Sequence, residues 1–134
     1  MNDLPFVLRA MDLLRSHGVR TWLCGSWAED LRGLRPPGRH GDLDLLYPAR
    51  GWSKVDELRL DWMDGRRLEW MRAFVLEGTM VELFLVERDK AGWFTRLAGR
   101  RHGWPDDVFT TNGRVGVAST AALAGFRAAY RRAA

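Results

Sequence analysis

The sequence predicts a single small α/β (α+β) domain, because segments with helical and with strand periodicity alternate along its 134 residues. Hydrophobic residues make up 46% of the chain and charged residues 28%, which is typical of a globular protein rather than a disordered one. A chain of this length buries about two-thirds of the surface that it exposes when unfolded. No repeat, low-complexity segment or linker divides it, so we expect one domain over residues 1–134.

Helical signals mark the start of the chain, the segment after a Gly-Ser pair, and the end of the chain. Each of these three helices is expected to begin at a side chain that accepts hydrogen bonds from free backbone N–H groups. The expected capping residues are Asn2 or Asp3, Ser26, and Ser119 or Thr120. Gly18 ends the first helix, and residues 33–38 break the second. The third helix covers residues 121–132 within a short helical C-terminal segment, 118–134.

Four segments have the composition and spacing of strands. Residues 19–24 and 43–47 are expected to form short strands. Residues 69–76 and 80–86 are predicted to form a hairpin around Glu77-Gly78-Thr79.

Two further segments carry weaker signals. In residues 48–64 the apolar side chains have helical spacing, but the segment is ambiguous. We expect residues 92–97 to form another helix, followed by a polar loop through Pro105.

Two aspartates at the start of the second strand are the first candidates for chemistry. Side chains alternate across a strand, so Asp42 and Asp44 are expected to share one face, roughly 6–7 Å apart, with Leu43 and Leu45 on the other. Carboxylates this close can share a hard, oxygen-seeking cation such as Mg²⁺. Without a cation, their like charges would repel and raise one of the two pKa values.

A third acid, Glu82, interrupts the otherwise apolar run Val81–Val86. A buried carboxylate without a partner is costly, so such a residue usually has one. The alternative is a glutamate that points to solvent from the face it shares with Phe84.

Residues 22–46 resemble the aminoglycoside and lincosamide nucleotidyltransferases, which belong to the DNA polymerase beta-like superfamily. The resemblance rests on the Gly25-Ser26 turn, the Trp-Ala-x-Asp pattern of residues 27–30, a glycine-containing loop, and His-Gly-Asp-x-Asp at residues 40–44. It implies the nucleotidyltransferase fold, a mixed β-sheet flanked by helices. It also implies metal-dependent transfer of a nucleoside monophosphate from a nucleoside triphosphate such as ATP to a hydroxyl of a small-molecule acceptor, with release of pyrophosphate.

The same resemblance implies roles for individual residues. Asp42, Asp44 and Glu82 would be the catalytic, metal-binding acids, holding two Mg²⁺ or Mn²⁺ ions, and Glu82 is also a candidate base for the acceptor hydroxyl. Gly25 would let the backbone approach phosphate, and Ser26 would donate a hydrogen bond to it.

Arg39 and His40 are further candidates for nucleotide binding, either by touching phosphate or by supporting Asp42, and an ordinary loop role is the alternative. Asp30 is interpreted as an exposed helix acid or a supporting residue. Cys24 has no adjacent base motif and is expected to be a buried apolar residue.

The chain also departs from the family pattern. Ser26 stands where antibiotic-modifying members often have glycine, and Arg127 stands where a lysine is expected. Only residues 92–134 remain for the helical domain that completes the acceptor pocket in larger members. The acceptor is therefore small, or a second subunit completes the pocket, or the acceptor is a macromolecule.

A homodimer is the simplest source of such a second subunit, since most soluble oligomers are closed homo-oligomers. The candidates for this contact are four apolar residues, unless they are buried in their own subunit: Trp93, Phe94, Leu97 and Trp104.

The leading hypothesis is therefore a nucleotidyltransferase that modifies an aminoglycoside or lincosamide antibiotic and so confers resistance. The alternatives are a minimal nucleotidyltransferase of a toxin–antitoxin pair that modifies a protein or RNA, and a non-catalytic nucleotide-binding module. A net charge of +4 does not by itself argue for nucleic acid as a partner. The absence of an apolar run of about 20 residues argues against a membrane span. A single cysteine and no secretory signal favour the cytoplasm.

Overall fold

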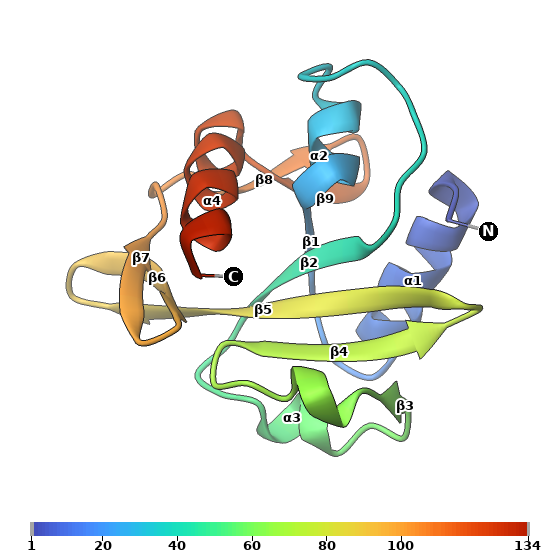
Figure 1. Ribbon diagram of the computed structural model, residues 1–134, viewed down its shortest axis with the longest axis horizontal. Coiled ribbons are helices and arrows are strands. Elements are labelled where there is room, and N and C mark those ends of the chain that lie inside the picture. Colours follow the sequence, from blue (N-terminus) through green and yellow to red (C-terminus); the bar gives the residue numbers. More distant parts are fainter. Residues whose placement is uncertain (1, 134) are drawn as a thin grey trace.

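The computed structural model describes residues 2–133, with side chains through Tyr130, and it contains a mixed β-sheet with helices packed against it (Figure 1). The helices are α1 (Leu4–Ser16), α2 (Gly25–Leu31), α3 (Ser53–Asp56) and α4 (Thr120–Ala133), with a 3₁₀ turn η1 (Asp64–Arg66). The strands are β1 (Trp22–Cys24), β2 (Leu43–Pro48), β3 (Asp61–Trp62), β4 (Met71–Leu76), β5 (Thr79–Asp89), β6 (Gly92–Leu97), β7 (Arg100–Gly103), β8 (Phe109–Asn112) and β9 (Val115–Ala118).

The sheet confirms the predicted fold class. Its main strand order is β3-β4-β5-β2-β1-β9-β8, and β6 and β7 extend from β5. The pairings β2–β5 and β1–β9 are parallel, whereas β1–β2 and β4–β5 are antiparallel, so the sheet is mixed. In Figure 1, α2 and α4 stand side by side near the β1–β2 part of the sheet, and α1 lies behind it. No helix in the described part of the chain is long and apolar enough to cross a membrane.

The first helix forms as its capping signal predicts. The Asp3 side chain accepts a hydrogen bond from the backbone N–H of Phe6 at 3.0 Å, and Pro5 occupies the first turn. Gly18 follows the helix with a φ of +79°, a left-handed conformation that favours glycine. The helix buries Phe6, Val7, Ala10 and Leu14 completely.

The β4–β5 hairpin is also confirmed, because both residues of its turn have positive φ. Glu77 has a φ of +50° and Gly78 a φ of +79°, as a two-residue hairpin turn requires. Strand β5 continues to Asp89, three residues beyond the predicted end. It is the central element of the site, since it pairs with β4 on one side and β2 on the other.

The helix predicted over residues 92–97 is wrong. These residues form β6, which pairs with the extended end of β5 and turns at Ala98 and Gly99, both of positive φ, into β7. Strand pairing across the two hairpin turns therefore decides the structure of residues 92–97, although their apolar side chains have helical spacing.

The four residues suggested for a dimer contact lie in or beside this hairpin and are largely buried in their own chain. Phe94, Leu97 and Trp104 are buried within their own chain, and Trp93 is half-buried against the ring of Phe109.

The structure resolves the ambiguous segment into short pieces and adds a hairpin that the sequence interpretation missed. After Pro48, which ends β2, residues 48–64 contain only the four-residue α3, the two-residue β3 and the start of η1. Strands β8 and β9 are joined by the two-residue turn Gly113-Arg114, in which Gly113 has a φ of +63°. Strand β9 then pairs with β1 and leads into α4, so this missed hairpin is what brings the C-terminal helix to the site.

Candidate active site

Two of the three predicted acids lie directly opposite one another on neighbouring strands. Asp44 of β2 is the register partner of Glu82 of β5, and the two strands are parallel. Adjacent strands are about 4.8 Å apart and register partners point to the same face, so the carboxyl groups meet above the sheet. Asp42 lies one residue before β2 and is exposed, but it hydrogen-bonds to Glu82. The structure therefore brings the three acids together.

Gly25 makes the close packing of Asp44 possible. It has a φ of +63°, and a Cβ atom added to it would lie 2.3 Å from Oδ2 of Asp44. A side chain at this position would therefore be strained and would also collide with the carboxylate. The missing side chain of Gly25 makes room for the Asp44 carboxylate, while the role of Gly25 toward phosphate stays a prediction.

The acid cluster reduces its negative charge by retaining a proton. Burial, and then the neighbouring Asp42 carboxylate, raise the pKa of Asp44 to about 6. Burial, and then the Asp44 carboxylate, raise the pKa of Glu82 to about 8. Because both pKa values are raised, the acid cluster retains a proton that is held in a hydrogen bond between its carboxyl groups.

The donor chemistry of this cluster fits a hard divalent cation. The acids supply only oxygen ligands, and the proton held between them occupies a position where positive charge is favoured. In the described part of the chain, no group of three or more His, Cys, Asp and Glu side chains already has the spacing of a metal site. The carboxyl groups would therefore have to adjust as a cation displaced the shared proton.

A cavity of about 290 Å³ opens beside Asp42 and Asp44. One wall is made of the start of β2 and of α2, and the other is made of α4. The residues lining it are Gly25, Ser26, Glu29, Asp42, Asp44, Leu123, Phe126, Arg127 and Tyr130. The second wall therefore comes from the same chain, which weakens the argument that the C-terminal segment is too short to enclose a ligand.

The α4 wall makes two polar contacts across the cavity. The hydroxyl of Tyr130 donates to Oε2 of Glu82 at 3.4 Å, and burial together with the Glu82 charge raises the pKa of Tyr130 to about 12. Arg127 forms an ion pair with Glu29 of α2. These contacts connect α4 to strand β5 and to helix α2.

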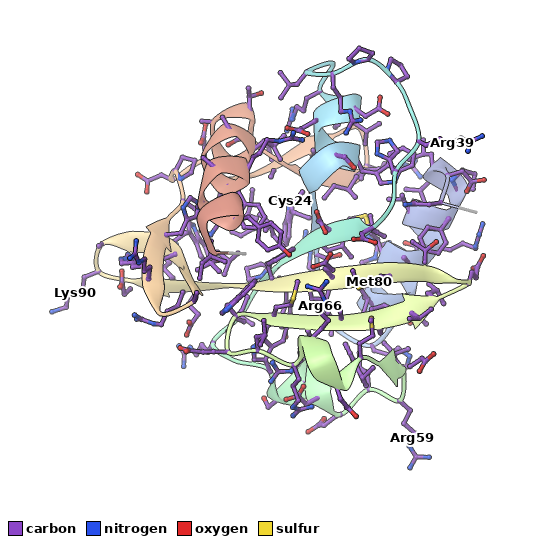
Figure 2. The ribbon with its side chains drawn as sticks, viewed as in Figure 1. Cys24, Arg39, Arg59, Arg66, Met80 and Lys90 are labelled. Atoms are coloured by element: carbon purple, nitrogen blue, oxygen red, sulfur yellow. The ribbon has the colours of Figure 1, made fainter. Side chains whose placement is uncertain are left out.

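Among the four residues predicted to bind nucleotide, only Gly25 and Ser26 line this cavity. The predicted helix cap is wrong, because α2 begins at Gly25 and Ser26 lies within its first turn. The Ser26 hydroxyl instead hydrogen-bonds to Nδ1 of His40 at 2.8 Å. The His40 side chain is only 1% exposed, and His40 does not line this cavity. Arg39 is exposed and points outward, away from the acids (Figure 2).

The expectation for Cys24 is confirmed, and Asp30 has a definite role. Cys24 is buried, and burial followed by the nearby Asp44 carboxylate raises the pKa of its thiol far above the usual range. The Asp30 carboxylate accepts from Nε2 of His40 at 2.9 Å.

Several residues at the site were not identified from sequence. Phe126 and Tyr130 recur four residues apart on α4, a helical spacing that could have indicated a shared face, although not what it packs against. Arg66 of η1 is half-buried and lies close enough to Glu82 for its charge to oppose the rise in the pKa of that acid. In Figure 2 its side chain extends across β4 and β5. No local pattern in the sequence marked it.

A family model described as aminoglycoside-2''-adenylyltransferase matches residues 6–82, more than half of the chain. The chain belongs to this family. The match includes β1, α2 and β2 and ends at Glu82, so it covers the three acids. This family member is accordingly a nucleotidyltransferase. No curated protein matches it in sequence.

Solved structures show the same fold. The lincosamide antibiotic adenylyltransferase LnuA, solved with lincomycin bound, aligns with a TM-score of 0.73 at 16% identity, over 96% of this chain and 87% of that one. ANT(2'')-Ia, solved in complex with adenylyl-2''-tobramycin, aligns with a TM-score of 0.61 at 17% identity, over 98% of this chain and 88% of that one.

The contact between Gly25 and Asp44 predicts the effect of adding one methyl group. Gly25→Ala is expected to unfold at a markedly lower urea concentration, because the new Cβ combines a left-handed φ with a collision. Gly33→Ala is the matched control, since Gly33 has a φ of +70° but no atom within 4 Å of its added Cβ. The control should lose only the backbone cost, about 1–2 kcal/mol. Equal losses in the two variants would contradict the collision.

The raised pKa of Glu82 predicts how stability depends on pH without metal. Its pKa is about 8 in the folded chain against an ordinary value of 4.5, so the folded state binds the proton more tightly. Stability should therefore fall as the pH rises through this window, and in EDTA the melting temperature should be lower at about pH 8 than at about pH 5. Glu82→Gln should remove most of this fall, whereas Glu87→Gln, farther along the same strand, should not. A wild-type slope retained in Glu82→Gln would show that other groups cause it.

Proposed function

We propose that this chain transfers a nucleoside monophosphate from a nucleoside triphosphate to a hydroxyl of an aminoglycoside or lincosamide antibiotic, with release of pyrophosphate. The observation that carries the proposal is the pairing of Asp44 with Glu82 across β2 and β5, beside Asp42, within a segment that matches an adenylyltransferase family. Toxin–antitoxin activity and a non-catalytic role have no feature of this site in their favour.

Asp42 and Asp44 would hold Mg²⁺ or Mn²⁺, and Glu82 would complete the site. Two such ions supply stabilisation of the attacking and leaving oxygens during displacement at phosphorus. The chain itself supplies the positioning: the paired strands fix Asp44 and Glu82, and Gly25 and Ser26 at the start of α2 line the cavity. Glu82 would also be the candidate to accept the proton of the acceptor hydroxyl, once a cation had displaced the proton that the metal-free acids retain.

The lining of the cavity favours an acceptor with amino groups and a ring. Three acids, Glu29, Asp42 and Asp44, and one base line it. Arg127 is that base and pairs with Glu29, so the two aspartates are the acids that suit a cationic amino sugar. The rings of Phe126 and Tyr130 form an apolar surface opposite these acids. A volume of about 290 Å³ is at the lower end for small-molecule sites, so the ligands would extend beyond the cavity. A homodimer that covers them is a further proposal, which light scattering during turnover would test.

The direct test measures pyrophosphate release with each of the four nucleoside triphosphates, Mg²⁺, and panels of aminoglycosides and lincosamides. Mass spectrometry of the antibiotic should show the addition of one nucleoside monophosphate. Release that requires a protein or RNA acceptor would instead favour the macromolecular alternative.

Asp44→Asn should abolish turnover without unfolding the protein. It removes one carboxylate from a cluster of like charges, so the metal-free variant should melt at a temperature equal to or above that of the wild type. Calorimetry should show that wild-type nucleotide affinity depends on Mg²⁺ or Mn²⁺. Asp61→Asn, on the exposed strand β3, is the control. Equal nucleotide affinity with and without a divalent ion would count against the mechanism.

Arg66 is proposed to bind the triphosphate. Its guanidinium is half-buried near the acids and, among the described residues, has no hydrogen-bond or ion-pair partner for its side chain. Arg66→Ala should raise the KM for the nucleotide about 10- to 100-fold, the loss of one or two hydrogen bonds to a charged group, with little change in melting temperature. Arg67→Ala, which removes a neighbouring arginine bound to Asp56, should leave this KM unchanged. Similar KM values for the two variants would exclude the contact.

A further inference from the structure

Asp42 depends on a loop for its position. It ends the irregular segment of residues 32–42 that joins α2 to β2, and the three glycines of this segment have no atom near their added Cβ positions. The pairing that fixes Asp44 and Glu82 begins only at Leu43. Other contacts must therefore hold the end of the loop.

Those contacts converge on His40. Its ring stacks on Trp27 with a centroid distance of 4.0 Å and an interplanar angle of 26°. Its two ring nitrogens hydrogen-bond to Ser26 and Asp30, at 2.8 and 2.9 Å. All three partners belong to α2, so one buried side chain attaches the loop along the helix.

The backbone around His40 is held as well. The side-chain amide of Asn2 donates to the carbonyl oxygens of His40 and Gly41, at 3.2 and 3.3 Å. The Asn2 side-chain oxygen accepts in turn from Nε1 of Trp27 at 2.9 Å. The two residues before Asp42 are therefore fixed by both the N-terminal segment and α2.

The hydrogen-bond chemistry also orients Ser26. The Asp30 carboxylate only accepts, so Nε2 of His40 carries the hydrogen. In the neutral ring Nδ1 then has only a lone pair, and Ser26 must donate its single hydrogen to it. Ser26 lines the cavity. Its hydroxyl oxygen is left with its lone pairs, so it can approach a cation or a cation-bound water but has no hydrogen for phosphate.

We propose that His40 is a positioning residue that presents the Ser26 oxygen to the cavity and holds Asp42 at its edge. This inference rests on the function proposed above, because it concerns the same cavity. It revises the sequence interpretation of Ser26, which acts as an acceptor rather than a phosphate donor. Of the two roles suggested for His40, it favours support of Asp42 over contact with the nucleotide.

The first test needs no turnover. Nitrogen-15 NMR of the wild-type chain, at a pH where the His40 ring is neutral, should show the hydrogen on Nε2 and none on Nδ1. A hydrogen on Nδ1 would overturn the orientation of Ser26. Titration with Mn²⁺ should show affinity about 10- to 100-fold weaker in His40→Phe, the size of effect seen when supports of metal ligands are removed. The phenylalanine retains a ring to stack on Trp27 but has no hydrogen-bonding group.

The second test separates positioning from folding. Ser26→Ala and His40→Asn are made singly and together, and kcat, KM and melting temperature are measured for each. Each single variant should lower kcat about 10- to 100-fold, and the double variant should lose little more, because both changes act through one oxygen. His17→Asn, just after α1, is the matched control and should behave as wild type.

Two outcomes would overturn the proposal. Variants that lose melting temperature but keep the wild-type kcat would show that His40 only stabilises the fold. A nucleotide found covalently attached to Ser26 would make that serine a nucleophile, activated by His40 and Asp30 as in a hydrolase triad. If the wild type transfers no nucleotide, the proposed function fails, yet the NMR and Mn²⁺ measurements still decide the role of His40.

Discussion

The parallel pairing of β2 with β5 is the constraint on which the site depends, because it holds two acids together against their repulsion. The pairing is enforced from the other face of the sheet, where Leu43, Leu45, Val81 and Leu83 are completely buried. Side chains alternate, so a slip of one residue would move these apolar groups to the site and an acid into the core. The core thus fixes the distance between the carboxyl groups, and proton sharing relieves the charge that this distance creates.

The β2–β5 pairing also constrains the elements that surround it. Strand β1 lies beside β2, with Cys24 opposite Asp44, so the next residue passes directly over the carboxylate and has to be glycine. Helix α2 begins at that glycine, which places Ser26 at the cavity. On the far side of β1, strand β9 carries the chain into α4, and Tyr130 reaches back to the acid of β5. Helices from distant parts of the sequence therefore meet over one strand pair.

The features that could be predicted from the sequence were those that depend on residues close together in the chain. Alternation, turn residues and capping residues located β2, β5, their acids and the first helix. Interactions between distant segments were not visible in the same way. The segment over residues 92–97 has helical spacing, but pairing with the end of β5 makes it a strand. Ser26 is a residue type that often caps helices, yet its hydroxyl hydrogen-bonds to His40, fourteen residues later in the sequence. The aromatic face of α4 could be located on the helix but not assigned to the cavity.

The three acids are therefore held by different means. Asp44 and Glu82 belong to paired strands in the core of the sheet, so moving either would break backbone hydrogen bonds that the apolar layer enforces. Asp42 lies outside the ladder and is positioned by side chains, chiefly those of Asn2 and His40. Side-chain contacts are individually weaker and easier to rearrange than a strand ladder in a packed sheet. The position of the exposed acid therefore depends on a few side-chain contacts around His40, whereas the backbone ladder fixes the buried pair.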